Sequence, residues 1–378
     1  MNYANKIKKY RKIEEKSVTC WAPFQAMHIN KKGRIKPCPF SMQPKNKADI
    51  AKQISWLDKK SLKDCWDDFV YEEMRAYSLE GSLHPEWCEY CAKQCIQGKP
   101  PSSLDYDYVG GRRDIDHEYP KELELELSNK CNYMCEACGP WCSSEWQKKI
   151  GLNGKYFESI FDDTSIKNKF IEDLRDIIHH IHRINFTGGE PFAQRVVYDI
   201  LKMIEDEDPK DLIIHFTTNG SVMNEAVKRI VKRKNTYFTV SLDSINPETY
   251  PLIRVNGNYD NVMKNINYMI KNSDNTVGAS FVLTKRNIME LPDMISWCND
   301  KNILFSYHIL ENMGYRDWER DLKPISIEHA SDEYIEDLKA HLIEKESHID
   351  VDKKNKISVK NFDMYHQYIS RLKREIFI

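Results

Sequence analysis

The spacing of apolar and polar positions changes repeatedly between residues 122 and 309. Short apolar runs predict strands, and longer stretches with apolar residues three and four apart predict helices. The expected strands are Glu122–Leu127, Arg183–Thr187, Leu212–Thr217, Tyr237–Leu242, Val277–Leu283 and Leu304–Ile309. The expected helices between them are Ile166–His180, Phe192–Glu205, Asn224–Lys234, Tyr259–Asn272 and Leu291–Asp300.

This alternation of strand and helix predicts an α/β fold. Its sheet is expected to be parallel with helices outside it, as a barrel or a doubly wound sheet. In both arrangements the functional site lies at the carboxyl ends of the strands. Polar motifs stand at those ends: Gly188-Gly189-Glu190, Thr218-Asn219-Gly220, and Ser241 with Asp243. These ends are therefore where we expect the site.

The N-terminal region has a different pattern. Two strands are expected at Ala26–Asn30 and Arg34–Lys36, around a turn at Gly33, and a helical stretch at Ser61–Leu79. A segment rich in Pro, Gly, Ser and charge then predicts a linker. The expected division is an N-terminal domain at 1–98, a linker at 99–118, a barrel at 119–312 and a charged, mainly helical extension at 313–378.

Composition narrows the class of protein. The chain has 378 residues, of which 41% are hydrophobic, so it holds enough apolar material for a sizeable core. A formal net charge of -2 does not favour attraction to nucleic acid or to an anionic membrane. No apolar run approaches the roughly 20 residues of a membrane span, and the first residues lack the apolar segment of a signal peptide. We therefore expect a cytoplasmic protein.

Cysteine is the residue type that needs an explanation. The chain has 11 cysteines, an odd number, and all but Cys298 lie between Cys20 and Cys142. In a cytoplasmic chain this favours metal or cluster ligands over disulfides. The cysteines form an N-terminal group (Cys20, Cys38, Cys65, Cys88, Cys91, Cys95) and a tight run (Cys131, Cys135, Cys138, Cys142).

The tight run places three thiols, Cys131, Cys135 and Cys138, on one short loop after the first expected strand of the alternation. Thiolates suit iron–sulfur clusters and zinc. Three ligands on a four-iron cube leave one iron open to a small chelating ligand. Cys142 would close such a cluster if it were a fourth ligand. Alternatively it lies behind the loop, because Ser143 and the residues after it are typical of a helix start.

At this point the sequence resembles a known family. The segment SNKCNYMCEAC is similar to the cluster-binding loop of the radical S-adenosylmethionine (SAM) superfamily, and FTGGEP, TTNG, VSLDS and Tyr250-x3-Arg254 follow in the family's order. The resemblance covers about residues 118–312. Ala137 stands where the family often has an aromatic residue, and Ser244 where it has glycine. Neither departure removes a cluster ligand.

The resemblance implies a partial (β/α)6 barrel, a [4Fe-4S] cluster on Cys131, Cys135 and Cys138, and SAM on its open iron. It implies a reaction in which SAM is cleaved reductively to a 5'-deoxyadenosyl radical that abstracts hydrogen from the substrate. The implied SAM contacts are a backbone approach at Gly188 and Gly189, Glu190 on the methionine ammonium, Asn219 along the cofactor wall, Ser241 and Asp243 near the ribose, Arg254 on the carboxylate and His308 near cofactor or substrate.

The N-terminal cysteines resemble the auxiliary-cluster module called twitch, a short relative of SPASM, in a family that carries it ahead of the barrel. The resemblance implies a second, auxiliary [4Fe-4S] cluster on Cys20, Cys38, Cys88 and Cys91. Cys95 is a reserve ligand and Cys65 a weaker one. A closed zinc site is the alternative, because four cysteines that include a C-x2-C pair also suit zinc.

Three functions remain open on the sequence. The first is radical modification of a peptide or protein side chain by crosslinking, epimerisation or oxidation. The second is the same chemistry on a small molecule, such as dehydrogenation of a sugar or cyclitol. The third, a non-catalytic iron–sulfur or zinc protein, leaves the SAM-site motifs without a purpose. The first two functions, which are catalytic, imply a flavodoxin- or ferredoxin-type reductant.

Overall fold

The computed structural model describes residues 20–41, 55–57, 59–96, 118–152, 158–310 and 325–374. Almost all of the expected linker at 99–118 lies outside them. The chain divides into two compact units: residues 1–128, 158–188 and 194–214 form the first, and residues 129–157, 189–193 and 215–378 form the second.

The first unit is built on neighbouring strands in the order β3-β2-β1-β4-β5. Their bounds are Ala26–Asn30 (β1), Arg34–Lys36 (β2), Ser55–Trp56 (β3), Glu122–Glu126 (β4) and Arg183–Phe186 (β5). β1 and β2 form the expected antiparallel pair, and Gly33 turns between them with a φ of +70° that favours glycine. β4 is parallel both to β1 and to β5.

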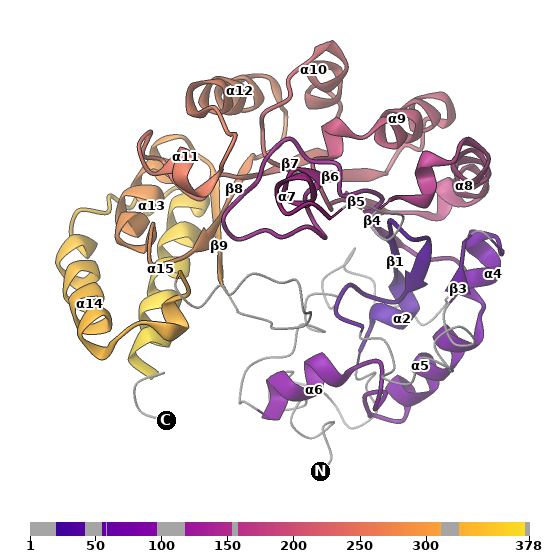
Figure 1. The fold of residues 1–378 in the computed structure, drawn as a ribbon, viewed down its shortest axis with the longest axis horizontal. Helices are drawn as coiled ribbons and strands as arrows, with labels where there is room; N and C mark the ends of the chain where they lie inside the picture. The colour runs from indigo at the N-terminus through magenta and orange to yellow at the C-terminus, as the bar shows by residue number, and fades with distance from the viewer. Residues whose placement is uncertain are drawn as a thin grey trace. The chain divides into compact units, whose positions relative to one another are not determined.

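Helices of the first unit follow from capping and apolar spacing. They are α2 (Ala22–Gln25), α4 (Leu62–Trp66), α5 (Phe69–Leu79), α6 (Glu89–Ile96), α8 (Thr164–Ile177) and α9 (Arg195–Glu207), with short 3-10 turns at Ile160–Asp162 and Ile178–His180. Asp163 caps α8, and Phe170, Leu174 and Ile177 are its buried residues. In Figure 1, α8 and α9 lie side by side, and the two helices are in contact.

The second unit contains neighbouring strands in the order β6-β7-β8-β9. Their bounds are Ile213–Thr218 (β6), whose first two residues belong to the first unit, Thr236–Ser241 (β7), Gly278–Leu283 (β8) and Leu304–Ile309 (β9). β8 is parallel to β7 and to β9. One side chain in two along these strands is buried, as the alternation of strand residues requires.

The second unit also contains helices and 3-10 turns. They are α7 (Ser144–Lys149), α10 (Glu225–Val231), α11 (Tyr250–Ile253), α12 (Tyr259–Asn272), α13 (Leu291–Asp300), α14 (Asp332–Glu346) and α15 (Lys356–Arg374), with 3-10 turns at Pro191–Ala193, Ile288–Glu290 and Ile327–His329. The C-terminal helix α15 contacts both α13 and β9. Figure 1 shows α14 and α15 beside α13 at the end of the chain.

The expected α/β fold with a parallel sheet is confirmed. β9, α12 and α13 have the predicted bounds, and the other expected strands are displaced by one residue at most at either end. The helical stretch expected at Ser61–Leu79 consists of two helices, because α4 ends at Trp66 and α5 begins at Phe69. Asp68 breaks the stretch, since its carboxylate accepts a hydrogen bond from the Phe69 N–H and so caps a new helix.

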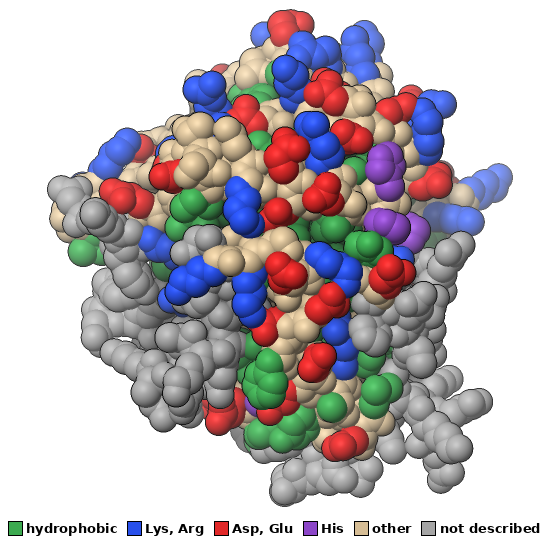
Figure 2. Space-filling view, turned by 90° about the vertical axis from the view of Figure 1, so that its right-hand side faces the viewer, with side chains coloured by type: hydrophobic (Ala, Val, Ile, Leu, Met, Phe, Trp, Pro, Cys, Tyr) green, Lys and Arg blue, Asp and Glu red, His purple; other side chains and the backbone are tan. Residues whose placement is uncertain are grey.

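The compact units follow a boundary other than residue 98, since the N-terminal β1 pairs with β4 inside the first unit. The four-part domain division therefore stays a prediction. Figure 2 shows one face of the molecule, on which acidic and basic side chains are interspersed among the described residues. This mixture agrees with the near balance of charges in the sequence.

Candidate active site

The loop that carries the tight cysteine run is fixed by the start of α7. The Ser143 hydroxyl donates to the Tyr133 carbonyl at 2.6 Å, and the Trp146 indole N–H donates to the Cys135 carbonyl at 2.8 Å. The Ser144 hydroxyl donates to the Cys131 carbonyl at 3.1 Å. Helix α7 begins at Ser144 with Ser143 as its cap, as the sequence predicted. These bonds satisfy the loop's carbonyls and leave its thiols for other partners.

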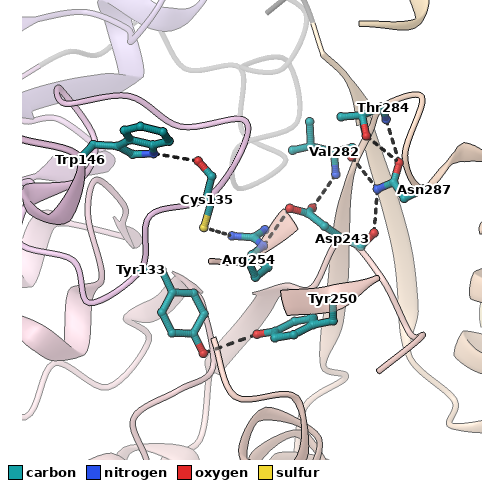
Figure 3. Close-up of polar contacts among 9 residues, drawn as sticks. All are labelled: Tyr133, Cys135, Trp146, Asp243, Tyr250, Arg254, Val282, Thr284 and Asn287. Atoms are coloured by element: carbon teal, nitrogen blue, oxygen red, sulfur yellow. Dashed lines mark hydrogen bonds and ion pairs between the residues drawn. The ribbon is translucent and has the colours of Figure 1, made fainter. Parts of the chain in front are cut away.

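Backbone bonds hold the other side of this loop against the turn after α11. The Met134 N–H donates to the Val255 carbonyl at 2.9 Å, and the Glu136 N–H donates to the Ile253 carbonyl at 2.7 Å. The Tyr250 hydroxyl donates to the Tyr133 hydroxyl at 3.5 Å. The loop is thus held in place on both sides of Cys135 (Figure 3).

The three thiols of the loop differ in acidity. A hydrogen bond from the Cys138 thiol, together with the nearby Arg254 guanidinium, lowers the pKa of Cys135 to about 7, although burial opposes this. The same bond and burial raise the pKa of Cys138, and burial raises that of Cys131 to about 11. The donor set fits an iron–sulfur cluster, since thiolates are the usual ligands of such clusters and bound metal would deprotonate these thiols.

Gly189 permits a close approach between two loops of the second unit. A Cβ at this position would lie 2.3 Å from the Lys130 carbonyl oxygen, and the Glu190 N–H donates to that same oxygen at 2.8 Å. The preceding Gly188 has a φ of +98°, which is also a glycine conformation. The Gly-Gly pair predicted from the sequence therefore has a structural reason in this chain.

We expect Gly189→Ala to destabilise the chain and to weaken SAM binding. The added methyl meets backbone atoms, which cannot rotate away, so we expect the free energy of unfolding to fall by about 1–3 kcal/mol. Thermal unfolding and SAM titration of the reconstituted protein measure both effects. Gly139→Ala is the matched control, since nothing lies within 4 Å of its added Cβ. Equal behaviour of the two variants would contradict the close-approach argument.

The Glu190 carboxyl is buried and accepts three hydrogen bonds. Oε1 accepts from the Thr218 hydroxyl at 2.7 Å and from the Phe192 N–H at 3.1 Å, and Oε2 accepts from the Asn219 N–H at 2.7 Å. Burial nevertheless raises the pKa of Glu190 above its ordinary value. A ligand cation beside this carboxyl would offset that desolvation.

Asn219 links the end of β6 to the loop that carries Cys131, Cys135 and Cys138. Its side-chain N–H donates to the Asn132 side-chain oxygen at 2.9 Å, and the same nitrogen lies 4.0 Å from the Cys131 sulfur. Its side-chain oxygen accepts from the Ser221 N–H at 2.9 Å. The structure therefore brings Asn219, Glu190 and Cys131 into one region of the second unit, as the motif order predicted.

Asp243 and Arg254 form a buried ion pair, with Arg254 Nε 2.8 Å from Asp243 Oδ2. Arg254 Nη1 also donates to the Cys135 sulfur at 3.4 Å (Figure 3). Burial alone would lower the pKa of Arg254, but the negative groups of Asp243, Cys135 and Cys138 raise it. The family resemblance suggested separate contacts to SAM for these two residues, and it did not indicate this pairing.

Two further predicted site residues, Ser241 and His308, lie at or near the carboxyl ends of β7 and β9. Ser241 ends β7 and is paired in register with Ser280 of β8. His308 is exposed on β9, whereas its neighbour Tyr307 is buried and packs edge-on against Tyr368 of α15. Adjacent strand residues face opposite sides of a sheet, so His308 and Tyr307 cannot share one site.

The N-terminal cysteines gather in the first unit. Cys88, Cys91 and Cys95 are three and four residues apart, so they lie along one face of the helical turn that begins at Cys88 and continues into α6. Cys20 and Cys38 pack into the same cluster. Burial raises the pKa of Cys88, and the neighbouring Cys20, Cys38 and Cys91 raise it further. Five thiols thus share this place.

Other cysteines are placed elsewhere. Cys65 is buried on α4, where burial raises its pKa to about 12, and Cys298 is buried on α13. Cys142 is exposed. Within the described residues, no three Cys, His, Asp or Glu side chains converge as the ligands of a single ion do. The thiol cluster of Cys20, Cys38, Cys88, Cys91 and Cys95 contains all four ligands predicted for the auxiliary site, together with the reserve ligand.

We expect Cys91→Ala to remove the auxiliary cluster, because it deletes a buried thiol of this group. The iron content of the reconstituted chain should fall by about four atoms, the number in one cube. Cys65→Ala is the control, a buried cysteine of the same unit outside the thiol cluster, and it should keep its iron. Iron loss in the Cys65 variant alone would contradict the assignment.

Comparison with known proteins identifies two domains along the chain. Residues 125–298 match the model of the Radical SAM superfamily, so the chain contains a radical SAM domain, which indicates an enzyme. Residues 20–96 match the SPASM model, an iron–sulfur cluster-binding domain, so an auxiliary-cluster domain lies ahead of the radical SAM domain in this chain. The two matches confirm the predicted cofactors: a [4Fe-4S] cluster, SAM and an auxiliary cluster.

Curated relatives are similar over part of their length. The "Probable GTP 3',8-cyclase" of Methanocaldococcus jannaschii is 29% identical over 48% of this chain and 55% of its own length. The "GTP 3',8-cyclase" of a Sulfurovum species is 26% identical over 51% of this chain and 54% of its own. The chain therefore spans about half the length of the curated relatives it matches.

Solved structures are more distant. Streptococcus suis SuiB bound to the precursor peptide SuiA is 17% identical, with a TM-score of 0.41 over 61% of this chain and 47% of that one. The structure of anSMEcpe with bound AdoMet is 15% identical, with a TM-score of 0.41 over 59% of each chain.

Among the described residues, no helix is both long and apolar enough to cross a bilayer.

Some residues of the site were not predicted from the sequence. Trp146 and Tyr133 stand within or just after the cysteine run, so proximity in sequence could have indicated them. Asn287, which is fully buried and hydrogen-bonded to the Asp243 carbonyl, belongs to no motif. The same holds for Arg286, which forms a two-pronged ion pair with Glu136 at 3.0 Å.

Proposed function

We propose that this chain cleaves SAM reductively and uses the resulting radical to abstract a hydrogen atom from a peptide or protein side chain. The observation that carries the chemistry is the meeting of the cluster loop, Glu190 and the Asp243–Arg254 pair in one compact unit. When bound, the cluster and SAM supply the electron and the radical, and the protein supplies binding, orientation and exclusion of water.

Cys131, Cys135 and Cys138 are the proposed ligands of the catalytic cluster. Their loop is held rigid by Ser143, Ser144 and Trp146, which fixes the thiols before any cofactor arrives. Such preorganisation lowers the entropy lost when the cluster binds. Cys142 is exposed, and we propose that it is not a ligand of the SAM-bound cluster.

SAM carries a zwitterionic methionine end, and Glu190 and Arg254 offer charges of opposite sign to it. We assign the ammonium to Glu190 and the carboxylate to those Arg254 N–H groups that do not face Asp243 or Cys135, since a guanidinium has five N–H donors. The backbone at Gly188 and Gly189 permits close approach. Asn219, Ser241, Asp243 and His308 complete the proposed cofactor residues.

Cys20, Cys38, Cys88 and Cys91 are the proposed ligands of the auxiliary cluster. Cys20 and Cys91 are buried, and the partly buried Cys38 and Cys88 pack against them, which favours a cluster largely shielded from water. Such a cluster would accept an electron from a substrate radical or brace the substrate. The auxiliary domain is the feature that supports a peptide substrate, and low-potential flavodoxin or ferredoxin is the proposed reductant. We place the reaction in the cytoplasm, where these reductants work.

A small-molecule substrate is the second candidate. It is favoured by the names of the curated relatives, which are GTP 3',8-cyclases. The match covers about half of each of those proteins. Their names favour a nucleotide substrate rather than the sugar or cyclitol suggested by the sequence.

One experiment tests both the radical chemistry and the class of substrate. The chain is reconstituted anaerobically and mixed with reductant and SAM, and 5'-deoxyadenosine is measured without substrate, with GTP, and with the small-peptide fraction of a cell extract. Its formation supports the radical chemistry. Stimulation by the peptide fraction and not by GTP supports the peptide substrate, and the reverse supports the second candidate. No product with any reductant, at about four or more iron atoms per chain, overturns the proposed chemistry.

A further inference from the structure

A buried amide lies at the centre of the contacts between the ends of β7 and β8. Asn287 follows β8 and is fully buried. Its side-chain nitrogen donates to the Asp243 carbonyl at 2.7 Å and to the Val282 carbonyl at 2.9 Å. Its side-chain oxygen accepts from the Thr284 N–H at 2.8 Å (Figure 3). Both N–H groups and the carbonyl of this amide therefore have partners.

These bonds hold Asp243 in an uncommon conformation. Its φ is +62°, in the left-handed region that non-glycine residues adopt rarely. Asn287 holds its carbonyl, and the Val282 N–H donates to its Oδ1 at 2.7 Å. The other carboxylate oxygen, Oδ2, faces Arg254 Nε at 2.8 Å. Asp243 is thus held by hydrogen bonds at its backbone carbonyl and Oδ1, and by an ion pair at Oδ2.

The guanidinium of Arg254 connects Asp243 to the loop of Cys131, Cys135 and Cys138. Its Nε is ion-paired with Asp243, and its Nη1 donates to the Cys135 sulfur at 3.4 Å. A second connection runs through Glu136, the residue after Cys135, whose carboxylate is paired with Arg286. The turn that contains Arg286 and Asn287 therefore contacts the loop at two neighbouring positions.

We propose that Asn287 is a positioning residue: through Asp243 it aims the Arg254 guanidinium at the Cys135 sulfur and so sets the reduction potential of the catalytic cluster. Hydrogen bonds and charges beside cluster sulfurs are among the factors that set such potentials. Reduction adds negative charge, and a fixed guanidinium stabilises that state, so correct aim makes the cluster easier to reduce. The inference rests on the proposed ligand role of Cys135.

The test is a redox titration of the reconstituted full chain, followed by electron paramagnetic resonance. At the potential where the wild-type catalytic cluster is half reduced, we expect the ratio of reduced to oxidised cluster to be about tenfold lower in Asn287→Ala. That change corresponds to about 59 mV for a one-electron couple. Iron content should stay at the wild-type level, and the auxiliary cluster in the same chain is the internal reference.

Asn361→Ala is the matched control. Asn361 is also fully buried. Its side-chain N–H groups donate to the Asn299 side-chain oxygen and the Ile303 carbonyl, and its side-chain oxygen accepts from the Phe305 N–H. These partners all lie on α13, on β9 or on the segment between them. Its loss should cost comparable stability without changing the potential. If Asn287→Ala does not fold, Asn287→Asp replaces it, because it keeps the acceptor for Thr284 and loses the donors to the two carbonyls.

The outcomes are separable. An unchanged potential in a folded, iron-replete Asn287 variant overturns the inference alone, as does an equal shift in Asn361→Ala. A wild-type chain that holds no catalytic cluster overturns both the inference and the proposed function. A shift confined to the Asn287 variants, with 5'-deoxyadenosine still formed at strong reducing power, supports the positioning role.

Discussion

Replacing Cys131, Cys135 and Cys138 together with Ala is expected to abolish 5'-deoxyadenosine formation completely. The three thiols lie on one loop that three side chains of the α7 start hold in place, so deleting them removes the donors while leaving the scaffold. Iron should fall from about eight to about four atoms per chain, because the auxiliary site lies in the other compact unit. Iron analysis, absorption spectra and product formation measure the result.

Cys142→Ala is the control for this triple variant. Cys142 belongs to the same run but is exposed, so its removal should leave both the iron content and SAM cleavage near the wild-type level. Loss of both clusters in the triple variant, or of neither, would contradict the two-site assignment. Loss of cleavage in Cys142→Ala would mean that Cys142 is required at the catalytic cluster.

The elements of the fold were largely readable from the sequence because each leaves a periodic trace. α12 and α13 have the predicted bounds, since apolar residues at helical spacing define them. β9 does too, as a short run with one face buried. The break inside the helical stretch Ser61–Leu79 was not predicted, because two adjacent aspartates interrupt a continuous helical pattern there and a cap can be mistaken for a polar helix face.

The site was predictable only as far as its motifs extend. Cysteine spacing indicated both thiol groups, and the position of motifs after strands indicated Glu190 and Asn219. The pairing of Asp243 with Arg254 was not indicated, because it depends on a side-chain geometry that no spacing encodes. The same applies to Asn287, which lies 44 residues from the carbonyl it holds. Buried polar networks are specific to one tertiary arrangement and have no period in sequence.

Glu190→Gln is expected to weaken SAM binding roughly 10- to 150-fold, the equivalent of about 1.5–3 kcal/mol for a hydrogen bond to a charged group. The substitution removes the charge that we assign to the methionine ammonium. It also places an amide where three donors, from Thr218, Phe192 and Asn219, need acceptors. Titration of the reconstituted chain with SAM measures the affinity. Glu290→Gln is the control, a carboxylate of the same unit that accepts from the Ser244 hydroxyl.

The pH dependence of binding separates a charge effect from a packing effect at Glu190. Burial raises the pKa of Glu190, so in the SAM-free chain its ionisation costs stability as the pH rises through that pKa. SAM binds the ionised form, so its affinity should fall as the pH falls through the same pKa, which lies above the ordinary carboxyl value of about 4.3. The loss should approach tenfold per pH unit on the acid side. Glu190→Gln should lose this slope while keeping its iron. An equal slope in the variant would show that Glu190 does not carry the charge that binds SAM.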